Sequence, residues 1–206
     1  MVQYQKEEVR DSIIKAARGE FIKHGYQKAS IRQIAEEAGV IPSNIYNYFD
    51  GKDGVFGEVL KPLIVELDNF KAFMIKWEFS DKSGDKHEGP GEHRRVMVES
   101  IKLVDKYRAL FKLLVFKSHG SSYEDYINKM VNWFTDNMYL HFKRNSGDLF
   151  SKFLIHNTTS IWFNFIKEIL RYDVSGKEMQ QATADMMTFI YSGHAGLKEW
   201  KKSQIR

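Results

Sequence analysis

The sequence predicts an all-helical protein, and three observations lead to this prediction. Apolar residues recur at spacings of three and four along most of the 206 residues, as they do on the buried face of a helix. No segment shows the regular apolar and polar alternation of a half-buried strand. Glycines and polar clusters separate the periodic segments, so we expect about nine helices.

Composition restricts the class of protein further. Hydrophobic residues make up 43% of the chain and charged residues 28%, which is typical of a folded globular protein. The absence of cysteine excludes disulfides, thiolate metal sites and cysteine catalysis. No apolar run approaches the ~20 residues of a membrane-spanning helix, and the polar N-terminus does not resemble a signal peptide, so we expect a cytoplasmic protein. The net charge of +4 is spread along the chain, so it does not by itself indicate a nucleic-acid partner.

Residues 13–25 predict the first helix. Ile13, Ala17 and Phe21 follow one another at spacings of four and therefore share one helix face. Gly25 comes directly after this face, and glycine most easily takes the left-handed conformation that ends a helix.

Two shorter helices are predicted next. Ser30 and Gln33 form a capping box, in which the Ser30 hydroxyl accepts from the Gln33 amide and the Gln33 side chain reaches back to Ser30. This second helix ends at Gly39. Pro42 suits the first turn of a third helix over 42–48, because its missing N–H would be unpaired there in any case. Two helices joined by a tight glycine turn form a helix-turn-helix pattern, although an ordinary three-helix bundle would show the same periodicity.

The remainder of the chain predicts longer helices. One extends from the residue after Lys52 to about Phe79, with Pro62 inside it, where a proline usually kinks the helix. The segment Ser80–Glu92 has no apolar residue and is predicted to be a surface loop. Helical periodicity resumes near Arg94 and is interrupted at 118–122, 145–148 and 173–176.

The last two helices predict a subunit interface. Residues 161–170 are apolar on nearly every side, and such a helix must be covered on every side. The final helix carries the small residues Gly193, Ala195 and Gly196, which permit close contact between helices. We therefore expect a homodimer through a four-helix contact; the alternative is that both helices belong to the core of a monomer.

A resemblance to a known family enters at residues 13–59. This quarter of the chain closely resembles the N-terminal domain of TetR-family transcriptional regulators, through the pattern Ile14-x-x-Ala17-x-x-x-Phe21-x-x-x-Gly25-Tyr26, the run from Ala29 to Val40, and Ile45-Tyr46-x-Tyr48-Phe49-x-x-Lys52-Asp53. The resemblance implies a helix-turn-helix DNA-binding domain over 1–52 and a helical effector-binding and dimerisation domain over 53–206. The sequence departs from the family at Ile41, where Ser or Thr usually caps the recognition helix, and at Ser43 and Gly51.

The motif predicts a set of DNA-contacting residues. The second helix of such a motif enters the major groove, and an asparagine amide can form two hydrogen bonds with the adenine edge, so Asn44 and Asn47 are the candidate base contacts. Tyr46, Tyr48 and Lys52 resemble the phosphate-contacting residues of the family. The other candidates offer an apolar surface, a hydroxyl, backbone amides or a charge to bases or phosphates: Pro42, Ser43, Ser30 and Arg32.

Each of these residues also has a purely structural interpretation. Asn44 and Asn47 can be solvated surface amides, and Tyr46 can be mainly a packing residue. Arg32 can pair with Glu36 one turn further along the helix.

The resemblance implies that the second domain binds an effector, and the helical faces indicate which residues line the pocket. The region 53–206 holds 23 of the 29 aromatic residues. A mostly apolar pocket with a few polar groups suits an apolar or aromatic effector. The candidate wall residues are Phe73, Trp77, Tyr107, Phe111, Met130, Trp133, Phe134, Asn137, Trp162 and Phe163. An aromatic stripe at helical spacing is also the ordinary pattern of a core.

These observations predict a one-component transcriptional regulator, a repressor that binds operator DNA as a homodimer and is released by a small-molecule effector. We expect no enzyme, cofactor or metal, because no glycine-rich phosphate loop or zinc-binding motif occurs. One alternative is a DNA-binding dimer without an effector, constitutive or controlled by a protein. Another is a small-molecule-binding helical protein whose DNA-binding domain is vestigial. We further hypothesise that Pro62 transmits effector binding to the DNA-binding domain.

Overall fold

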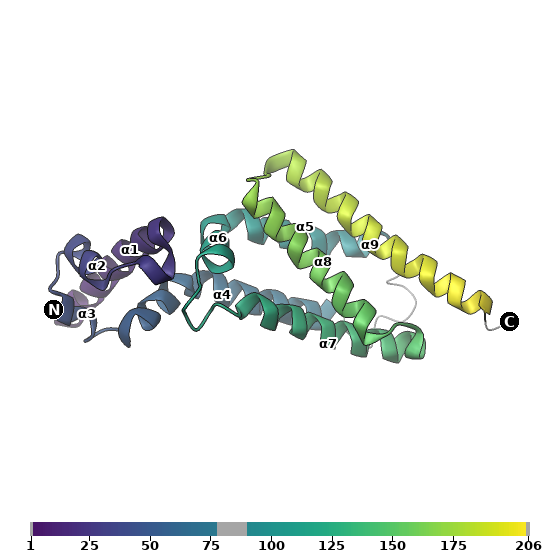
Figure 1. The fold of residues 1–206 in the computed structure, drawn as a ribbon, viewed down its shortest axis with the longest axis horizontal. Coiled ribbons are helices and arrows are strands. Elements are labelled where there is room, and N and C mark those ends of the chain that lie inside the picture. The colour runs from purple at the N-terminus through teal and green to yellow at the C-terminus, as the bar shows by residue number, and fades with distance from the viewer. Residues whose placement is uncertain (1, 78–89, 205–206) are drawn as a thin grey trace. The chain divides into compact units, whose positions relative to one another are not determined.

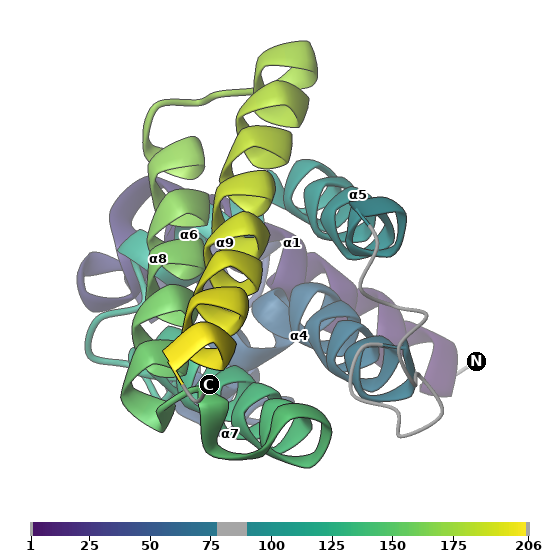
Figure 2. The same cartoon turned by 90° about the vertical axis from the view of Figure 1, so that its right-hand side faces the viewer.

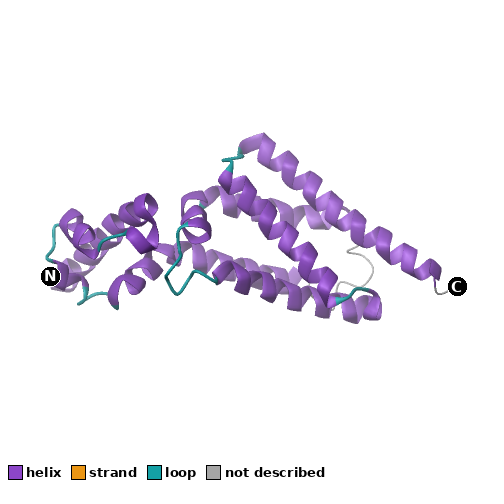
Figure 3. Cartoon of the chain, viewed as in Figure 1, coloured by secondary structure: helices purple, strands orange, loops and turns teal. Residues whose placement is uncertain are grey.

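The computed structural model describes residues 2–77 and 90–204, and within them every regular element is a helix (Figures 1 and 3). The order along the chain is α1 (Val2–Lys28), α2 (Ile31–Ala38), α3 (Pro42–Ile45), α4 (Gly51–Trp77), α5 (Pro90–Lys106), α6 (Arg108–Phe116), α7 (Tyr126–Ser146), a 3-10 turn (Gly147–Leu149), α8 (Lys152–Arg171) and α9 (Gly176–Gln204). The prediction of an all-helical fold with about nine helices is confirmed for this part of the chain. None of the helices in these two ranges is long and apolar enough to cross a membrane.

The chain forms two compact units. The first unit comprises Met1–Leu67 and Ala109–Tyr126, and the second comprises Asp68–Arg108 and Ile127–Arg206. The boundary predicted at residue 52 therefore falls inside the first unit. The reason is that the early turns of α4 and the connection between α6 and α7 share one apolar core with α1.

Aromatic rings form the centre of the first unit. The Phe56 ring of α4 makes edge contacts with Phe21 at 4.9 Å, Tyr26 at 5.0 Å and Tyr123 at 6.0 Å between ring centroids. Phe21 and Phe56 are fully buried. One side chain of α4 thus joins the end of α1 to the connection before α7.

The break predicted at Gly25 is present. Gly25 has φ 73° and ψ 168°, values that interrupt the helical conformation inside α1. The turn that follows is held by the residue after α6, because the Tyr26 amide donates to the Lys117 carbonyl at 2.8 Å. The Lys117 ammonium in turn donates to the Ile22 carbonyl.

Two predicted boundaries need correction, and one break was not predicted. The third helix ends at Ile45 rather than at residue 48, because the Asn47 and Tyr48 amides bond to carbonyls three residues back and tighten the chain. The predicted loop Ser80–Glu92 ends too late, because α5 already begins at Pro90, a residue suited to a first helical turn. Residues 80–89 of this loop lie outside the described residues. The break at Tyr107, which separates α5 from α6, was not predicted.

The second unit contains the two C-terminal helices. In Figure 2, α9 lies beside both α8 and α5, in agreement with their contacts. The turn between α8 and α9 is fixed by Arg108, whose guanidinium donates to the Val174 carbonyl at 2.8 Å. Asp173, in this turn, has a positive φ of 55°. The break predicted at 173–176 is therefore present.

Candidate functional site

The helix-turn-helix is built from α2 and α3, with α1 packed against α2. Ile34 and Ala35 of α2, Ile45 of α3 and Phe49 are buried, so these helices turn their other faces to solvent. Gly39 has φ 71° and ends α2 in the left-handed conformation, with its amide bonded to the Ala35 and Glu36 carbonyls. The tight turn predicted from the sequence is thus the one observed.

The start of α2 is capped from two sides, and only one of them was predicted. The Gln33 amide donates to the Ser30 hydroxyl at 3.4 Å, as the capping box requires. The reciprocal bond is made by Glu20 of α1, whose carboxylate accepts from the Ser30 amide at 3.0 Å, and not by the Gln33 side chain. Glu20 is 6% exposed, so a buried carboxylate fixes α2 against α1. Its position seven residues after Ile13 places it on the apolar face of α1, which is a signal that the sequence offered.

The start of α3 lacks such a cap. Ile41 occupies the N-cap position without a side-chain hydrogen bond, and Pro42 begins the helix. The Ile41 side chain is 68% exposed. An apolar side chain is therefore presented to solvent beside the first turn of the recognition segment, which we define as residues 41–48.

The recognition segment exposes most of the side chains that the sequence assigns to DNA. Pro42, Ser43 and Asn47 are exposed, Tyr46 is 60% exposed, and Asn44 is half-buried. The Asn47 amide nitrogen donates to the Asn44 side-chain oxygen at 3.1 Å. Tyr48, which is also half-buried, lies 6.3 Å from the Phe49 ring.

The basic candidates differ in their surroundings. Arg32 is exposed on α2 and forms no ion pair with Glu36 in the described structure, so its guanidinium faces solvent. Lys52, by contrast, donates to the Gln27 carbonyl at 3.2 Å and to the Ala29 carbonyl at 2.9 Å. The ammonium also lies 4.7 Å from the Tyr26 ring centre. Burial lowers the pKa of Lys52, partly opposed by the charge of Glu20.

Lys52 therefore already has a structural role within the first unit. Its two bonds hold the carbonyls at the end of α1, which leaves one N–H of the ammonium for a phosphate. Ser30 is in a similar position, because its amide is taken by Glu20 while its hydroxyl proton is free to bind a phosphate oxygen.

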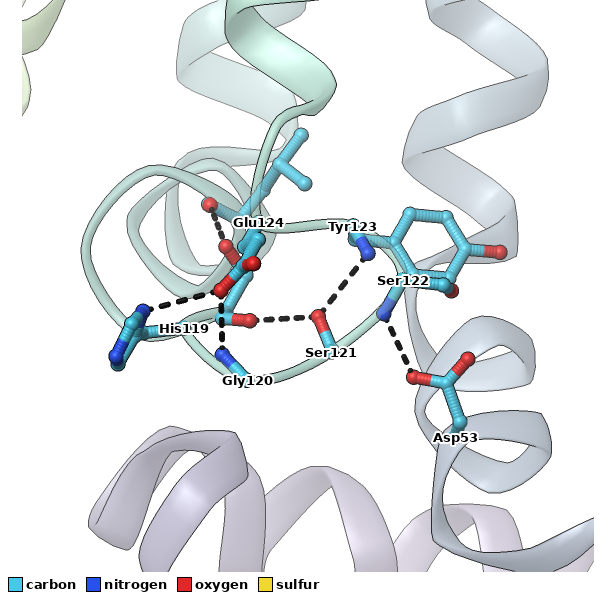
Figure 4. A network of polar contacts seen from close by, with 9 residues as sticks. Asp53, His119, Gly120, Ser121, Ser122, Tyr123 and Glu124 are labelled. Carbon is cyan, nitrogen blue, oxygen red and sulfur yellow. Dashed lines mark hydrogen bonds and ion pairs between the residues drawn. The ribbon is translucent and has the colours of Figure 1, made fainter.

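The connection between α6 and α7 forms a closed polar network against α4 (Figure 4). Glu124 accepts from the Gly120 amide at 2.8 Å and pairs with His119 at 3.0 Å. The Ser122 amide donates to Asp53, in the first turn of α4, at 3.0 Å. Asp53 is thereby tied to the connection, two residues after the start of the helix that follows the recognition segment.

Tyr123 packs closely against the same turn of α4. A methyl group at Gly57 would lie 2.9 Å from the Tyr123 hydroxyl oxygen, so only glycine fits there without movement. Burial, and then the charges of Asp53 and Glu58, raise the pKa of Tyr123. Glycine at position 57 thus allows the connection to approach the α4 backbone.

A second polar contact fixes α1 to α4. Arg10 donates to Glu58 at 2.5 Å, and Lys61 donates to the same carboxylate at 3.2 Å. Burial favours a raised pKa of Glu58, but the hydrogen bonds and charges of Arg10 and Lys61 outweigh it, and the pKa is lowered. The Arg10 guanidinium also lies 5.4 Å from the centre of the Phe49 ring, next to the recognition segment.

Several candidate effector residues come together in the second unit. The Phe134 ring lies 4.9 Å from Trp133, 5.7 Å from Phe163 and 6.3 Å from Phe70. Phe70 in turn lies 6.1 Å from Phe73. We call these five rings the aromatic cluster. Phe70 was not among the predicted wall residues, although it lies three residues before Phe73 on α4.

The remaining candidates have other positions. Met130 is buried, Trp162 is half-buried with its ring 5.5 Å from Phe165, and Tyr107 lies in the break between α5 and α6. Asn137 uses its amide nitrogen to bond the Trp133 carbonyl at 2.8 Å, which leaves its oxygen as the free polar group. Phe111 is buried in α6 and belongs to the first unit. The side chain of Trp77 lies outside the described residues.

His194 of α9 is a polar group that the sequence reasoning missed. It is 7% exposed, and neither ring nitrogen has a hydrogen-bond partner in the described structure. Its ring lies 5.4 Å from both Phe142 and Phe150. Burial lowers the pKa of His194.

Residues 13–59 match the model of the bacterial regulatory proteins of the tetR family. The N-terminal region of the chain is thus similar to the DNA-binding domain of this family. The match covers α2, α3 and the adjoining parts of α1 and α4, which are the elements that carry the helix-turn-helix. A comparison with curated proteins finds no match.

Solved structures with the same fold cover nearly the whole chain. NalD of Pseudomonas aeruginosa, described as the secondary repressor of the MexAB-OprM multidrug efflux pump, has a TM-score of 0.66 at 16% identity, over 92% of this chain and 97% of NalD. FadR of Bacillus halodurans, a fatty acid degradation regulator, has a TM-score of 0.63 at 15% identity, over 88% and 94% of the two chains. FadR of Bacillus subtilis in complex with stearoyl-CoA has a TM-score of 0.57 at 17% identity, over 88% and 97%. At these identities the likeness shows that the C-terminal region shares the TetR fold.

Proposed function

We propose that this chain is a one-component transcriptional repressor, which binds operator DNA as a homodimer and is released by a small-molecule effector. The exposed polar surface of the recognition segment carries the proposal. Two asparagine amides, a tyrosine hydroxyl and an apolar side chain are presented together there, and these groups match the hydrogen-bonding edges and thymine methyl groups of the major groove.

Dimerisation is supported by an exposed apolar stripe on α9. Phe189 is 71% exposed and Trp200 is 58% exposed, and Gly193 and Gly196 lie between them at spacings that keep all four on one helix face. An added methyl group at either glycine would meet no atom within 4 Å. Two large side chains that flank a flat, bare backbone form a surface on which a second helix can pack closely.

The neighbouring helix α8 also exposes apolar side chains. Ile161 is 42% exposed and Phe153 is 78% exposed, at a spacing of eight residues that keeps them on similar sides of the helix. Several large exposed apolar side chains on two neighbouring helices are typical of an interaction site. Both helices together support the four-helix contact proposed for the dimer.

The effector is proposed to bind at the aromatic cluster of the second unit. Its rings, with the Asn137 oxygen nearby in sequence on α7, offer an apolar surface with few polar groups. Bacillus subtilis FadR, which shares the fold, was solved with stearoyl-CoA, and this supports an apolar or amphiphilic effector here as well.

A route from effector to DNA follows from the continuity of α4. Its residues up to Leu67 belong to the first unit and those from Asp68 to the second, so a shift of its second half is carried covalently into the first. Pro62 lies within this helix, before the division. For such a shift to release DNA, the effector must bind the DNA-binding state and the released state of the protein with different affinities.

The decisive experiment is a titration of the full chain against the intergenic DNA upstream of its own gene, at stated salt, with scrambled DNA of equal length as competitor. Specific operator binding predicts a preference of ~10³-fold or more. Equal weak binding to both DNAs would contradict the proposal for this operator. With binding established, a ligand that raises the melting temperature and releases the DNA would identify the effector.

A further inference from the structure

We infer that Asn44 and Asn47 act on DNA as one unit, in which Asn47 orients the amide of Asn44 toward an adenine. This inference rests on the proposed function, since it concerns how the recognition segment selects its base pair. It assigns Asn47 as a positioning residue and Asn44 as the residue that contacts the base.

The two side chains are joined before DNA arrives. The Asn47 amide nitrogen donates to the Asn44 side-chain oxygen at 3.1 Å, and the Asn47 backbone amide donates to the Asn44 backbone oxygen, also at 3.1 Å. Two parallel bonds therefore connect the same two residues. The second of them belongs to the tight turn that ends α3 at Ile45, so the early end of the helix brings the amides together.

This hydrogen bond fixes the orientation of the Asn44 side-chain amide. The oxygen faces Asn47, and the nitrogen with its two protons faces away from it. Without the bond, the amide group of a partly exposed asparagine would rotate among orientations, and DNA binding would have to select one of them. Asn44 is half-buried while Asn47 is exposed, so the orientation of the Asn44 amide is limited both by its surroundings and by this bond.

The remaining hydrogen-bonding groups of Asn44 match adenine. Its oxygen has a second lone pair, which can accept from the adenine N6 amino group, and its nitrogen can donate to N7. Guanine presents two acceptors, N7 and O6, on the same edge. The oriented Asn44 oxygen would face the guanine O6, so the pair disfavours guanine at this position.

The rest of the helix holds the pair in place. Ile45 is fully buried and Phe49 is 6% exposed, and these side chains anchor the recognition segment on the side opposite the amides. Exchange of the exposed Asn47 side chain therefore changes the amide pair without disturbing the core.

The test uses the full chain and a pool of 40-base-pair duplexes with 20 randomised central positions, bound at one salt concentration and sequenced after selection. We expect the wild type to enrich an adenine at one position of each half-site, with a preference of roughly 10-fold or more over guanine. Asn44→Ala is expected to lose the preference at this position. Asn47→Leu, of similar size and without charge, is expected to lose it at the same position, while Asn47→Gln, which retains the amide donor, restores part of it.

Affinity for the selected duplex then separates a coupled pair from two independent contacts. We expect the double variant Asn44→Ala with Asn47→Leu to bind with nearly the same affinity as Asn44→Ala alone, within about twofold. Asn132→Leu, the same substitution at an exposed position of α7, is expected to match the wild type. Unchanged helix content and melting temperature show that each variant is folded.

Two results would overturn the inference, and they differ from each other. If Asn47→Leu altered the preference at a different base pair and the double variant lost affinity additively, each asparagine would contact its own base. If the wild type enriched no sequence at all, the proposed operator binding would fail together with the amide unit.

Discussion

Gly25→Ala is expected to destabilise the first unit, while Gly19→Ala in the same helix is expected to stabilise it. Gly25 has φ 73° and ψ 168°, a region open almost only to glycine, where another residue costs of order 1–3 kcal/mol. The new methyl group would lie at ordinary contact distance from Lys117, at 3.4 Å, so the cost comes from the backbone conformation. Alanine also restricts the unfolded chain, which offsets about 0.5–1 kcal/mol. The expected net loss is about 1–2 kcal/mol.

Gly19 provides the matched control, because its environment lacks both causes. A methyl group there would meet nothing within 4 Å, and the residue is helical. Replacement of a helical glycine by alanine stabilises by about 0.5–1 kcal/mol. The two variants, six residues apart, are thus expected to differ by about 1.5–3 kcal/mol in the free energy of unfolding, with opposite signs relative to the wild type.

The assay has to report on the first unit. The four tryptophans, at 77, 133, 162 and 200, all lie in the second unit, so their fluorescence does not follow α1. Urea unfolding monitored by helix circular dichroism, combined with hydrogen exchange of the Tyr26 amide, measures the stability of the break directly. Equal stability of Gly25→Ala and Gly19→Ala, with the same exchange rate at Tyr26, would refute the reasoning from the backbone conformation.

Three further predictions follow from buried groups and exposed faces. Glu20→Ala leaves the Ser30 amide unpaired and is expected to cost about 1–2 kcal/mol in urea unfolding, whereas Glu20→Gln, which retains an acceptor oxygen, should lose much less. The lowered pKa of His194 means that the unfolded chain binds a proton more readily, so stability is full above pH 6.5 and falls as the pH drops toward the folded value. His194→Leu should weaken that pH dependence, and an unchanged difference between urea midpoints at pH 7.5 and 5.5 would contradict this. Gly193→Leu fills the bare part of the α9 stripe and is expected to shift sedimentation equilibrium toward monomer; an unaffected dimer would place the interface elsewhere.

The helical architecture could be predicted because its signals are local. Gly39, Pro42 and Gly176 act on the backbone of their own turn, and each marks the end or beginning of a helix in the structure. Gly25 likewise interrupts the helical conformation within α1. The order of helices therefore follows from periodicity and these residues. The end of α3 did not follow, because the change to tighter turn bonds after Ile45 depends on how Phe49 is held in the core.

The partners of polar side chains were less predictable, because they depend on segments far apart in the sequence. Glu20 caps α2 across ten residues, and Ser122 bonds Asp53 across 69 residues. The exposure of the recognition segment followed from its motif, since the buried positions of a helix-turn-helix fix which side chains face outward. The bond between Asn44 and Asn47 was within reach of the sequence, because residues three apart are neighbours both on a helix and in the tight turn that ends one.

The aromatic cluster shows the limit of reasoning from helical faces. Helical periodicity identifies which aromatic side chains face the core, but it does not identify which of them contact one another between helices. Phe73 and Phe134 are joined through Phe70, whereas Phe111, also inward, belongs to the first unit. Contacts between helices require the packing of the whole unit, which no single helix specifies.

The contact of Phe56 with Tyr123 limits how this protein can be shortened or recombined. A fragment ending at residue 52 would lack Phe56, and one ending at Leu67 would leave this ring without Tyr123 and the end of α1 without Lys117. A chimaera that transfers the head to another sensor must therefore carry two separate stretches of chain, up to Leu67 and from Ala109 to Tyr126. A graft confined to residues 41–48 would leave that shared core intact, which makes this short segment the natural cassette for exchanging DNA specificity.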